Sequence, residues 1–325
     1  KEKYIFLFES VDKGSQKGRY SVIGLQPDLI WECKNNQCEF QDLNNSKRKK
    51  VLKQKPLESL RELFDKNKLN FPISIPSISS GLFGYMGYEM IQHFENINLC
   101  KKNNLNLPDS IFIRPSITLV FDNVNDKIII TKLVCKNHLS HRQSFKNAKD
   151  EIEKIVEKIN KPISKKSFGS LPNNKKINIF KNVESNTTFE EFKKMVNKAK
   201  KYIYEGEIFQ VVLSRIFKKK IKTDPISIYR ALRFLNPSPY LFFMNFNNFV
   251  IVGSSPEILI KLEEKKVTIR PIAGTRKRGK NAKEDQNLEN ELINDPKEIS
   301  EHLMLLDLGR NDLSRVTIPG TVKVT

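Results

Sequence analysis

Cysteine, tryptophan and long apolar runs are scarce in this chain of 325 residues, which holds four Cys and one Trp. The cysteines form no CxxC pair and have no histidine at metal-site spacing; they are Cys33, Cys38, Cys100 and Cys135. Free thiols in a reducing compartment are therefore expected. No apolar run reaches the roughly 18 residues of a transmembrane helix, and no secretory signal is recognisable. A cytoplasmic protein without a membrane partner is predicted.

Acidic residues are also in deficit. The chain has 57 Lys and Arg against 37 Asp and Glu, a formal net charge of +20, which favours anionic ligands. The lysines are scattered among Asn and Ile, and no basic stripe with interleaved aromatics or other nucleic-acid motif is present. A basic protein that binds RNA or an acidic partner is thus a minor alternative, and no nucleic-acid partner is expected.

Strand-like and helix-like segments alternate in both halves of the chain. Hairpins are predicted with turns at residues 35–36, 123–126, 247–248 and 265–266. Helices are predicted at residues 56–67, 141–160, 189–205, 226–235 and 282–293. Hairpins with intervening helices predict an α+β protein with large antiparallel sheets and helices outside.

The best linker is the Pro-, Gly-, Ser- and Lys-containing stretch 161–186. It divides the chain into an N-terminal region, 1–160, and a second domain, 187–325. Residues 44–55 are rich in Lys and Asn and are predicted to be a solvated loop. The run IFQVVLSRIF at 208–217 is predicted to be a buried strand with one amide side chain facing inward or into a cleft.

A run near the end of the chain reads NDPKEISEHLMLLDLGRND and opens like a helix, with Asp295 as its cap and Pro296 at its first position. Glu298, Glu301 and His302 then fall on one face. Two carboxylates one turn apart suit a divalent cation such as Mg²⁺, which prefers oxygen to the imidazole of His302. On spacing alone, a surface helix whose glutamates suit its positive N-terminal end is the stronger interpretation.

Several runs together carry a resemblance to a known family. They are, in chain order, FES with GRYSVIG, GLFGYMGYEM, LPDSIFIRPS, IFQVVLSR, NPSPYLFF, VGSSPEIL, TIRPIAGTRKRG and DPKEISEHLMLLDLGRNDLSRV. The chain resembles the chorismate-utilising enzymes, and most closely the large, component I subunits of anthranilate synthases. The resemblance covers nearly the whole chain and is weakest at 26–70 and 136–186.

This resemblance implies an αββα sandwich of large antiparallel sheets, with residues 187–325 as an incomplete chorismate-binding domain. It implies that chorismate and ammonia are converted to anthranilate and pyruvate with Mg²⁺, the first step of tryptophan biosynthesis. Ammonia would come from a separate glutamine amidotransferase subunit, component II. Tryptophan would inhibit by feedback at a site away from the substrate.

Residue roles follow from the resemblance position by position. Glu301 and Glu298 match carboxylates of the Mg²⁺ site, and Gly274 and Thr275 match a pair that contacts chorismate. Glu257 matches the proposed general acid for departure of the ring hydroxyl, a role that needs a raised pKa. Without the resemblance, AGT fits an ordinary turn better, and Glu257 after Pro256 fits a turn or helix-start residue as well as a general acid.

Two positions separate relatives that catalyse different reactions. Gln210 stands where the water-using isochorismate and salicylate synthases carry a lysine base, and a glutamine cannot activate water, so ammonia fits better. Ala273 stands where aminodeoxychorismate synthases usually carry a lysine that is proposed as nucleophile. Anthranilate is therefore the expected product, and aminodeoxychorismate synthase of the folate pathway is the alternative.

The resemblance also implies a tryptophan site drawn from both halves of the chain. Its residues are Glu9, Ser10, Asn236, Pro239, Tyr240 and Leu241. The chain departs from the family pattern in reading LFES, and in Leu241 where a methionine is usual; leucine keeps the bulk. Taken alone, NPSPY also fits a turn that ends a helix, because two prolines forbid its continuation.

The family pattern continues beyond the end of this chain, and the chain begins at Lys1 without a methionine. We expect a C-terminally truncated sequence that is also short at its N-terminus. The absent segment would hold the second Mg²⁺ glutamate and the loop that binds the chorismate carboxylate. The truncated chain alone is expected to be inactive.

Overall fold

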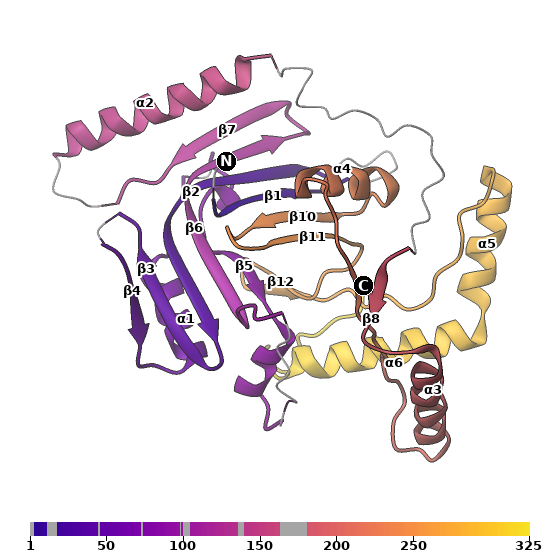
Figure 1. Cartoon of the computed structure of the whole chain (residues 1–325). Coiled ribbons are helices and arrows are strands. Elements are labelled where there is room, and N and C mark those ends of the chain that lie inside the picture. Colours follow the sequence, from indigo (N-terminus) through magenta and orange to yellow (C-terminus); the bar gives the residue numbers. More distant parts are fainter. Residues whose placement is uncertain are drawn as a thin grey trace. The chain divides into compact units, whose positions relative to one another are not determined.

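The computed structural model describes residues 3–11, 18–44, 46–72, 74–97, 99, 105–135, 140–162 and 181–325 (Figure 1). The chain divides into two compact units. One combines Lys1–Val156 with Pro225–Thr325, and the other is Glu157–Asp224. Cys100 lies outside the described residues.

The first unit is built on a nine-stranded sheet whose strand pairs are all antiparallel. Its strands are β1 (Ile5–Glu9), β2 (Tyr20–Lys34), β3 (Gln37–Asp42), β4 (Ser46–Leu52), β5 (Phe83–Met86), β6 (Ser110–Asp122), β7 (Lys127–Lys132), β10 (Tyr240–Asn245) and β11 (Val250–Ser255). The main order is β11-β10-β1-β2-β3-β4; β6 also pairs with β2, and β5 and β7 both pair with β6. The predicted α+β class with a large antiparallel sheet is confirmed.

The sheet includes strands from both sides of the predicted linker. Strand β1 lies between β2 and β10, as Figure 1 shows, and Ile5–Glu9 pairs with Leu241–Asn245 in unbroken register. The N-terminal strand and the β10–β11 hairpin are therefore hydrogen-bonded parts of one sheet. Residues that are distant in sequence meet along this β1–β10 pair.

Helices cover the sheet where apolar side chains alternate outward from the strands. Helix α1 (Pro56–Lys66) packs Leu63 into a cluster with Trp31 of β2, and α2 (His141–Asn160) packs Ile155 onto Ile117 of β6. Helix α4 (Pro225–Leu235) places Tyr229 in a cluster with strand β10. Each helix thus buries one apolar face, as the helical periodicity predicts.

The predicted hairpins are all present. Asn35 and Asn36, at φ 49° and 64°, form the two-residue turn between β2 and β3. Such positive φ values suit Asn and match the twist of the paired strands. The last hairpin, β12 (Lys261–Glu263) with β13 (Lys266–Thr268), turns at residues 264–265, one residue before the predicted position.

Caps fix the helices near the C-terminus. Helix α5 (Ala282–Asn294) is capped by Asn281, and α6 (Pro296–Ser314) by Asp295, whose carboxylate accepts the backbone N–H groups of Lys297 and Glu298. The predicted cap and start of α6 are confirmed. Short 3₁₀ helices, η1 (Ser77–Ser79) and η2 (Tyr88–His93), flank β5. No helix in the described ranges is long and apolar enough to cross a membrane.

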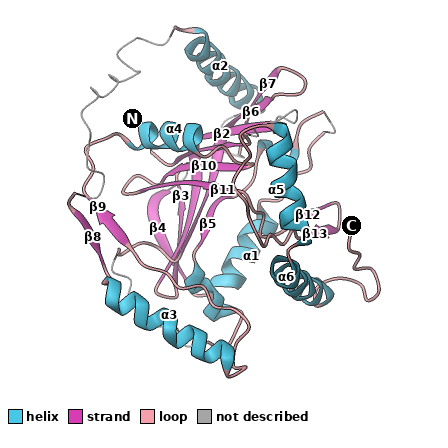
Figure 2. Cartoon of the chain, turned by 90° about the vertical axis from the view of Figure 1, so that its right-hand side faces the viewer, coloured by secondary structure: helices cyan, strands magenta, loops and turns pink. Residues whose placement is uncertain are grey.

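The second unit holds α3 (Phe189–Tyr204) and the pair β8 (Val183–Ser185) with β9 (Phe217–Lys219) (Figure 2). Thr188 and Glu191 form the predicted capping box, each side chain accepting the other's backbone N–H. Gly206, at φ 75°, ends the helix as predicted.

Two sequence-based predictions are wrong. The stretch 44–55 contains strand β4 instead of a solvated loop, since Lys49 forms ion pairs with Glu39 at 2.8 Å and Glu32 at 3.5 Å across the sheet. The stretch 208–217 forms no strand before Phe217, where β9 begins. Phe209 is 88% exposed there, because a buried strand needs partners that apolar content alone does not supply.

Candidate functional site

Arg276 joins the AGTR loop to the first turn of α6. Its guanidinium donates to Glu298 at 3.2 Å, to Asp295 at 2.8 Å and to Glu291, near the end of α5, at 2.9 Å. Its Nη1 also donates to the backbone carbonyl of Thr275 at 3.2 Å. The hydrogen bonds with Glu291 and Glu298 raise the pKa of Arg276 above its usual value. A permanent cation thus lies among three carboxylates.

Gly274 lies directly against the Glu298 carboxylate. A Cβ added to Gly274 would lie 1.9 Å from Oε2 of Glu298 and 3.0 Å from Cδ1 of Leu292. A side chain at this position would therefore require the Glu298 carboxylate to move. The structure brings the predicted substrate loop and the predicted metal ligand Glu298 together.

The second predicted metal ligand, Glu301, is half-buried on α6, one turn after Glu298, whereas His302 is exposed. Mg²⁺ is commonly held by one or two carboxylates together with water and substrate oxygens, so this donor pair fits the ion chemically. Among the residues that the structure describes, no group of three or more Asp, Glu, His or Cys side chains is arranged to hold a metal.

The two predicted catalytic side chains, Glu257 and Gln210, are both exposed. Glu257 is exposed, and its backbone is fixed by a turn in which its N–H donates to Ser255 Oγ at 3.3 Å. The burial expected of a general acid is not found at Glu257. Gln210 is exposed in the second unit, whereas the α6 residues and Glu257 belong to the first. Within the first unit, the structure groups Gly274, Thr275 and Glu298.

The predicted effector residues meet at the β1–β10 pair. Glu9 lies opposite Leu241 in register, and the backbone N–H of Val11 donates to the carbonyl of Ser238 at 3.0 Å. Ser254 Oγ donates to the carbonyl of Asn236 at 2.7 Å. The end of β1 and the NPSPY turn are thereby hydrogen-bonded neighbours.

Helix α4 holds the Glu9 carboxylate in this region. Tyr229 Oη donates to Glu9 Oε2 at 2.5 Å, and Arg233 Nε donates to the same oxygen at 3.1 Å. Burial, followed by the hydrogen bond with Glu9, raises the pKa of Tyr229 above its usual value. Tyr229 therefore stays protonated and serves as a fixed donor.

The side chains of the effector cluster differ in exposure. Leu241 is 1% exposed in the core cluster with Tyr229, whereas Tyr240 is 41% exposed. Gly18 packs against Ser10 so closely that a Cβ on Gly18 would lie 2.0 Å from Ser10 Oγ. The side chain of Tyr240 is thus accessible to a ligand, whereas Leu241 packs in the core beneath the sheet surface.

Arg276, Tyr229 and Arg233 were not among the residues predicted from the sequence. Arg276 follows directly after the AGT motif, and this adjacency was the available signal. Tyr229 and Arg233 are four residues apart and share a helix face, which is a local signal for a common partner. Their partner Glu9, however, is too distant in sequence for any local pattern to identify.

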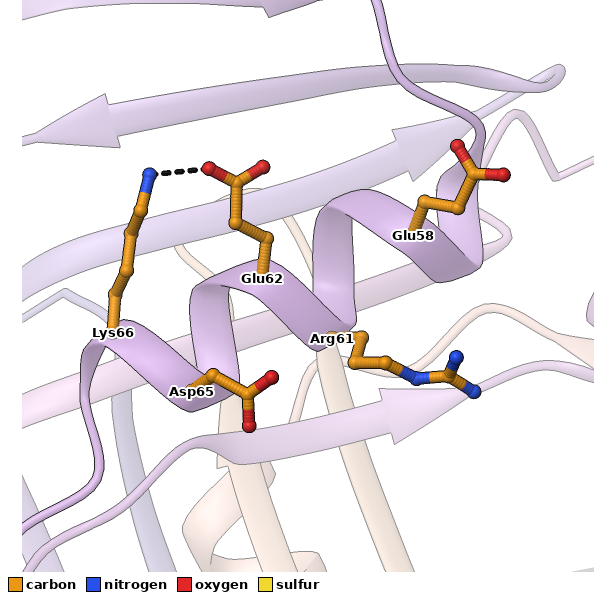
Figure 3. Close-up of a pocket in the computed structure, with 5 residues that line it drawn as sticks. All are labelled: Glu58, Arg61, Glu62, Asp65 and Lys66. Carbon is orange, nitrogen blue, oxygen red and sulfur yellow. Dashed lines mark hydrogen bonds and ion pairs between the residues drawn. The ribbon is translucent and has the colours of Figure 1, made fainter.

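A shallow depression along α1 is lined by charged side chains (Figure 3). They are Glu58, Arg61, Glu62, Asp65 and Lys66, with Lys66 and Glu62 in an ion pair. Three carboxylates on one solvent-facing helix disfavour an anionic substrate. The lining includes none of the predicted site residues, so the depression is not a candidate site.

Comparison with known proteins identifies relatives of the chain. The family model described as chorismate binding enzyme matches residues 5–325. The anthranilate synthase component 1 of Cereibacter sphaeroides is 41% identical over 324 residues, which cover 98% of this chain and 64% of that protein. Anthranilate synthase component 1 of Acetivibrio thermocellus is 41% identical over 322 residues, with 98% and 64% covered.

A solved structure of a protein with a similar name also matches the chain. The crystal structure of anthranilate synthase component I from Streptococcus pneumoniae matches with a TM-score of 0.74 at 28% identity, covering 95% of this chain and 64% of that chain. The chain thus spans less than two thirds of the length of these relatives. From the family match over residues 5–325, the chain belongs to the chorismate binding enzyme family.

Proposed function

We propose that the complete polypeptide carrying this sequence is the large subunit of an anthranilate synthase. In this reaction ammonia adds to the chorismate ring, the ring hydroxyl leaves as water, and pyruvate is eliminated to give anthranilate. The observation that carries the proposal is the 41% identity over nearly the whole chain to proteins named anthranilate synthase component 1. Tryptophan biosynthesis would then be the pathway.

Gln210 and Ala273 support ammonia as nucleophile and anthranilate as product. A glutamine amide has no basic site at neutral pH, so Gln210 cannot deprotonate water. An alanine methyl cannot attack a ring carbon, so Ala273 leaves no covalent route through that position. The alternative product, aminodeoxychorismate, is aminated but not aromatised.

Glu298 and Glu301 are the proposed Mg²⁺ ligands of this chain. When bound, Mg²⁺ would neutralise the substrate carboxylate and draw negative charge from the ring, which eases addition at the adjacent carbon. The contact between Glu298 and Gly274 supports this role, since it places a candidate ligand beside the loop proposed to touch chorismate. In this proposal the backbone of Gly274 and the hydroxyl of Thr275 orient the substrate.

Glu257 is proposed to protonate the departing ring hydroxyl. It is exposed among the described residues, so the role requires that bound substrate or further chain cover it. The turn from Ser255 to Glu257, closed by hydrogen bonds of 3.3 and 3.2 Å, supports a fixed backbone for that carboxyl.

Regulation by tryptophan and a glutamine amidotransferase partner belong to the same proposal. The clustering of Glu9 and Ser10 with the NPSPY turn supports a single effector site on the first unit. The words "component 1" in the relatives' names support a second subunit. A cytoplasmic location agrees with the free thiols of Cys33 and Cys38.

Product identity tests the proposal. The complete polypeptide is incubated with chorismate, an ammonium salt and Mg²⁺, and the products are separated and identified by mass. Anthranilate with an equal amount of pyruvate supports the proposal. An aminated product that retains the enolpyruvyl group supports aminodeoxychorismate synthase instead. Steep salt-dependent binding of RNA without turnover would favour the basic binding protein.

A further inference from the structure

The loop at 274–281 contacts residues near both the start and the end of helix α5. Near the start of α5, the backbone N–H of Gly279 donates to Asp285 at 2.8 Å, and Arg278 pairs with the same carboxylate at 2.7 Å. Near its end, Arg276 pairs with Glu291, and also with Asp295 just before α6. The loop is therefore clamped by its own side chains and backbone.

Arg276 is the residue through which this clamp reaches α6. Its side chain is 23% exposed, whereas that of Arg278 is 89% exposed and has one carboxylate partner. Arg276 contacts Oε1 of Glu298, while Oε2 of the same carboxylate lies against Gly274. The guanidinium donates to one oxygen and the other lies beside Gly274, so the carboxylate is oriented between Arg276 and the loop.

We propose that Arg276 is a positioning residue that fixes the Gly274–Thr275 loop and the Glu298 carboxylate in one arrangement for chorismate binding. The effect on chorismate rests on the function proposed above, whereas the clamp itself does not. The planar fork of a guanidinium matches this task, because it reaches three carboxylates and a carbonyl at once. A lysine would supply the charge without the fork.

Loss of Arg276 has opposing electrostatic and geometric effects. Without the cation, Glu291, Asp295 and Glu298 repel one another, and the loop is released from α6. The greater negative charge would attract Mg²⁺ more strongly, but this surface attraction is screened by salt. Loss of groups that orient a metal ligand commonly costs about 10- to 100-fold in metal affinity or activity, so we expect the geometric effect to dominate.

The test compares Arg276→Gln, Arg276→Lys and the matched control Arg278→Gln in the complete polypeptide. Hydrogen exchange of the 272–279 peptide reports the clamp without any ligand. Calorimetry with chorismate and Mg²⁺ reports the dissociation constant without turnover. We expect Arg276→Gln to raise both the exchange rate and the dissociation constant about tenfold or more. Arg276→Lys should give intermediate values and Arg278→Gln values near those of the unsubstituted protein.

If Arg276 had only a structural role, Arg276→Gln would lower the fraction of active protein and leave the chorismate dissociation constant and KM unchanged. That outcome overturns the proposal, as does loop exchange in Arg276→Gln equal to that of Arg278→Gln. If chorismate binds but another product forms, the proposed function is wrong. The dissociation constants of the variants then still decide the proposal for Arg276. Complete loss of folding in Arg276→Gln is resolved by Arg276→Lys, which keeps the charge.

Discussion

Tyr229 donates a hydrogen bond of 2.5 Å to the carboxylate of Glu9, and so ties α4 to the end of the first strand. Arg233 donates to the same oxygen from one turn further along α4. These contacts fix the strand end that carries Ser10 relative to the helix that leads into NPSPY. The candidate effector site is therefore part of one hydrogen-bonded assembly.

Replacing Tyr229 with Phe removes this donor and keeps the ring, which packs edge-on against Phe243 at 5.9 Å between centroids. The Glu9 carboxylate loses one partner, so the free energy of unfolding should fall by about 1–3 kcal/mol. Denaturant unfolding followed by the fluorescence of Trp31 measures this, because Trp31 is fully buried in the same sheet. Tyr240→Phe, on a half-exposed ring, is the control. Equal stability of the two variants would contradict the assigned hydrogen bond.

Alkaline pH should destabilise the fold through buried phenols. Burial is the main cause that raises the pKa of both Tyr85 and Tyr229 above the usual 10.0. The unfolded chain loses these protons near pH 10 and the folded chain only at higher pH, so stability is intact below pH 10 and falls above it. Unfolding midpoints at a series of pH values test this, and Tyr229→Phe should show a shallower decline. Stability that rises above pH 10 would contradict the prediction.

Gly274→Ala should damage the site more than the fold. The new methyl group would overlap the Glu298 carboxylate, and that flexible side chain would move aside. We expect the catalytic efficiency of the complete polypeptide to fall about 10-fold or more, with a near-native circular dichroism spectrum. Gly309→Ala is the matched control, since a Cβ there lies 3.9 Å from its nearest neighbour, Ile269 Cγ2. Equal activity of the two variants would remove the proposed role of the Gly274–Glu298 contact.

Tyr240→Ala should weaken the proposed tryptophan site. Its ring is accessible beside the NPSPY turn, and loss of an aromatic contact worth about 1.4 kcal/mol corresponds to a tenfold loss of affinity. Calorimetric titration of the complete polypeptide with tryptophan measures the change. Lys266→Ala, on the β12–β13 hairpin, is the control. An unsubstituted protein that does not bind tryptophan would remove the effector site from the account.

Local signals in the sequence predict much of the fold. The Asn pair at 35–36 marks a hairpin because these residues accept positive φ, and Asp295 marks the start of α6 because its carboxylate satisfies free backbone N–H groups. The stretch 44–55 defeats such reasoning. Its Lys residues suit solvent, but the stretch pairs with β3, and Lys49 forms ion pairs with Glu32 of β2 and Glu39 of β3.

The candidate site was predictable only in part. Runs shared with a known family predict roles for Glu298, Gly274 and Glu9, but chain spacing does not reveal which residues each of them contacts. The partnership of Arg276 with three carboxylates depends on how α5 and α6 fold back onto the loop, and that of Glu9 with Tyr229 depends on long-range strand pairing. The stretch 208–217 shows the same limit, because its apolar residues form no strand before Phe217.

Anthranilate fluorescence tests the proposed Mg²⁺ site most directly. It is followed in the complete polypeptide and in its Glu301→Gln variant, each supplied with chorismate and an ammonium salt, with and without Mg²⁺. We expect anthranilate to appear only with Mg²⁺, and the Glu301→Gln variant, which keeps the size of the side chain but removes its charge, to form none. Chorismate consumed without anthranilate, or full Mg²⁺-dependent turnover by Glu301→Gln, would contradict this expectation.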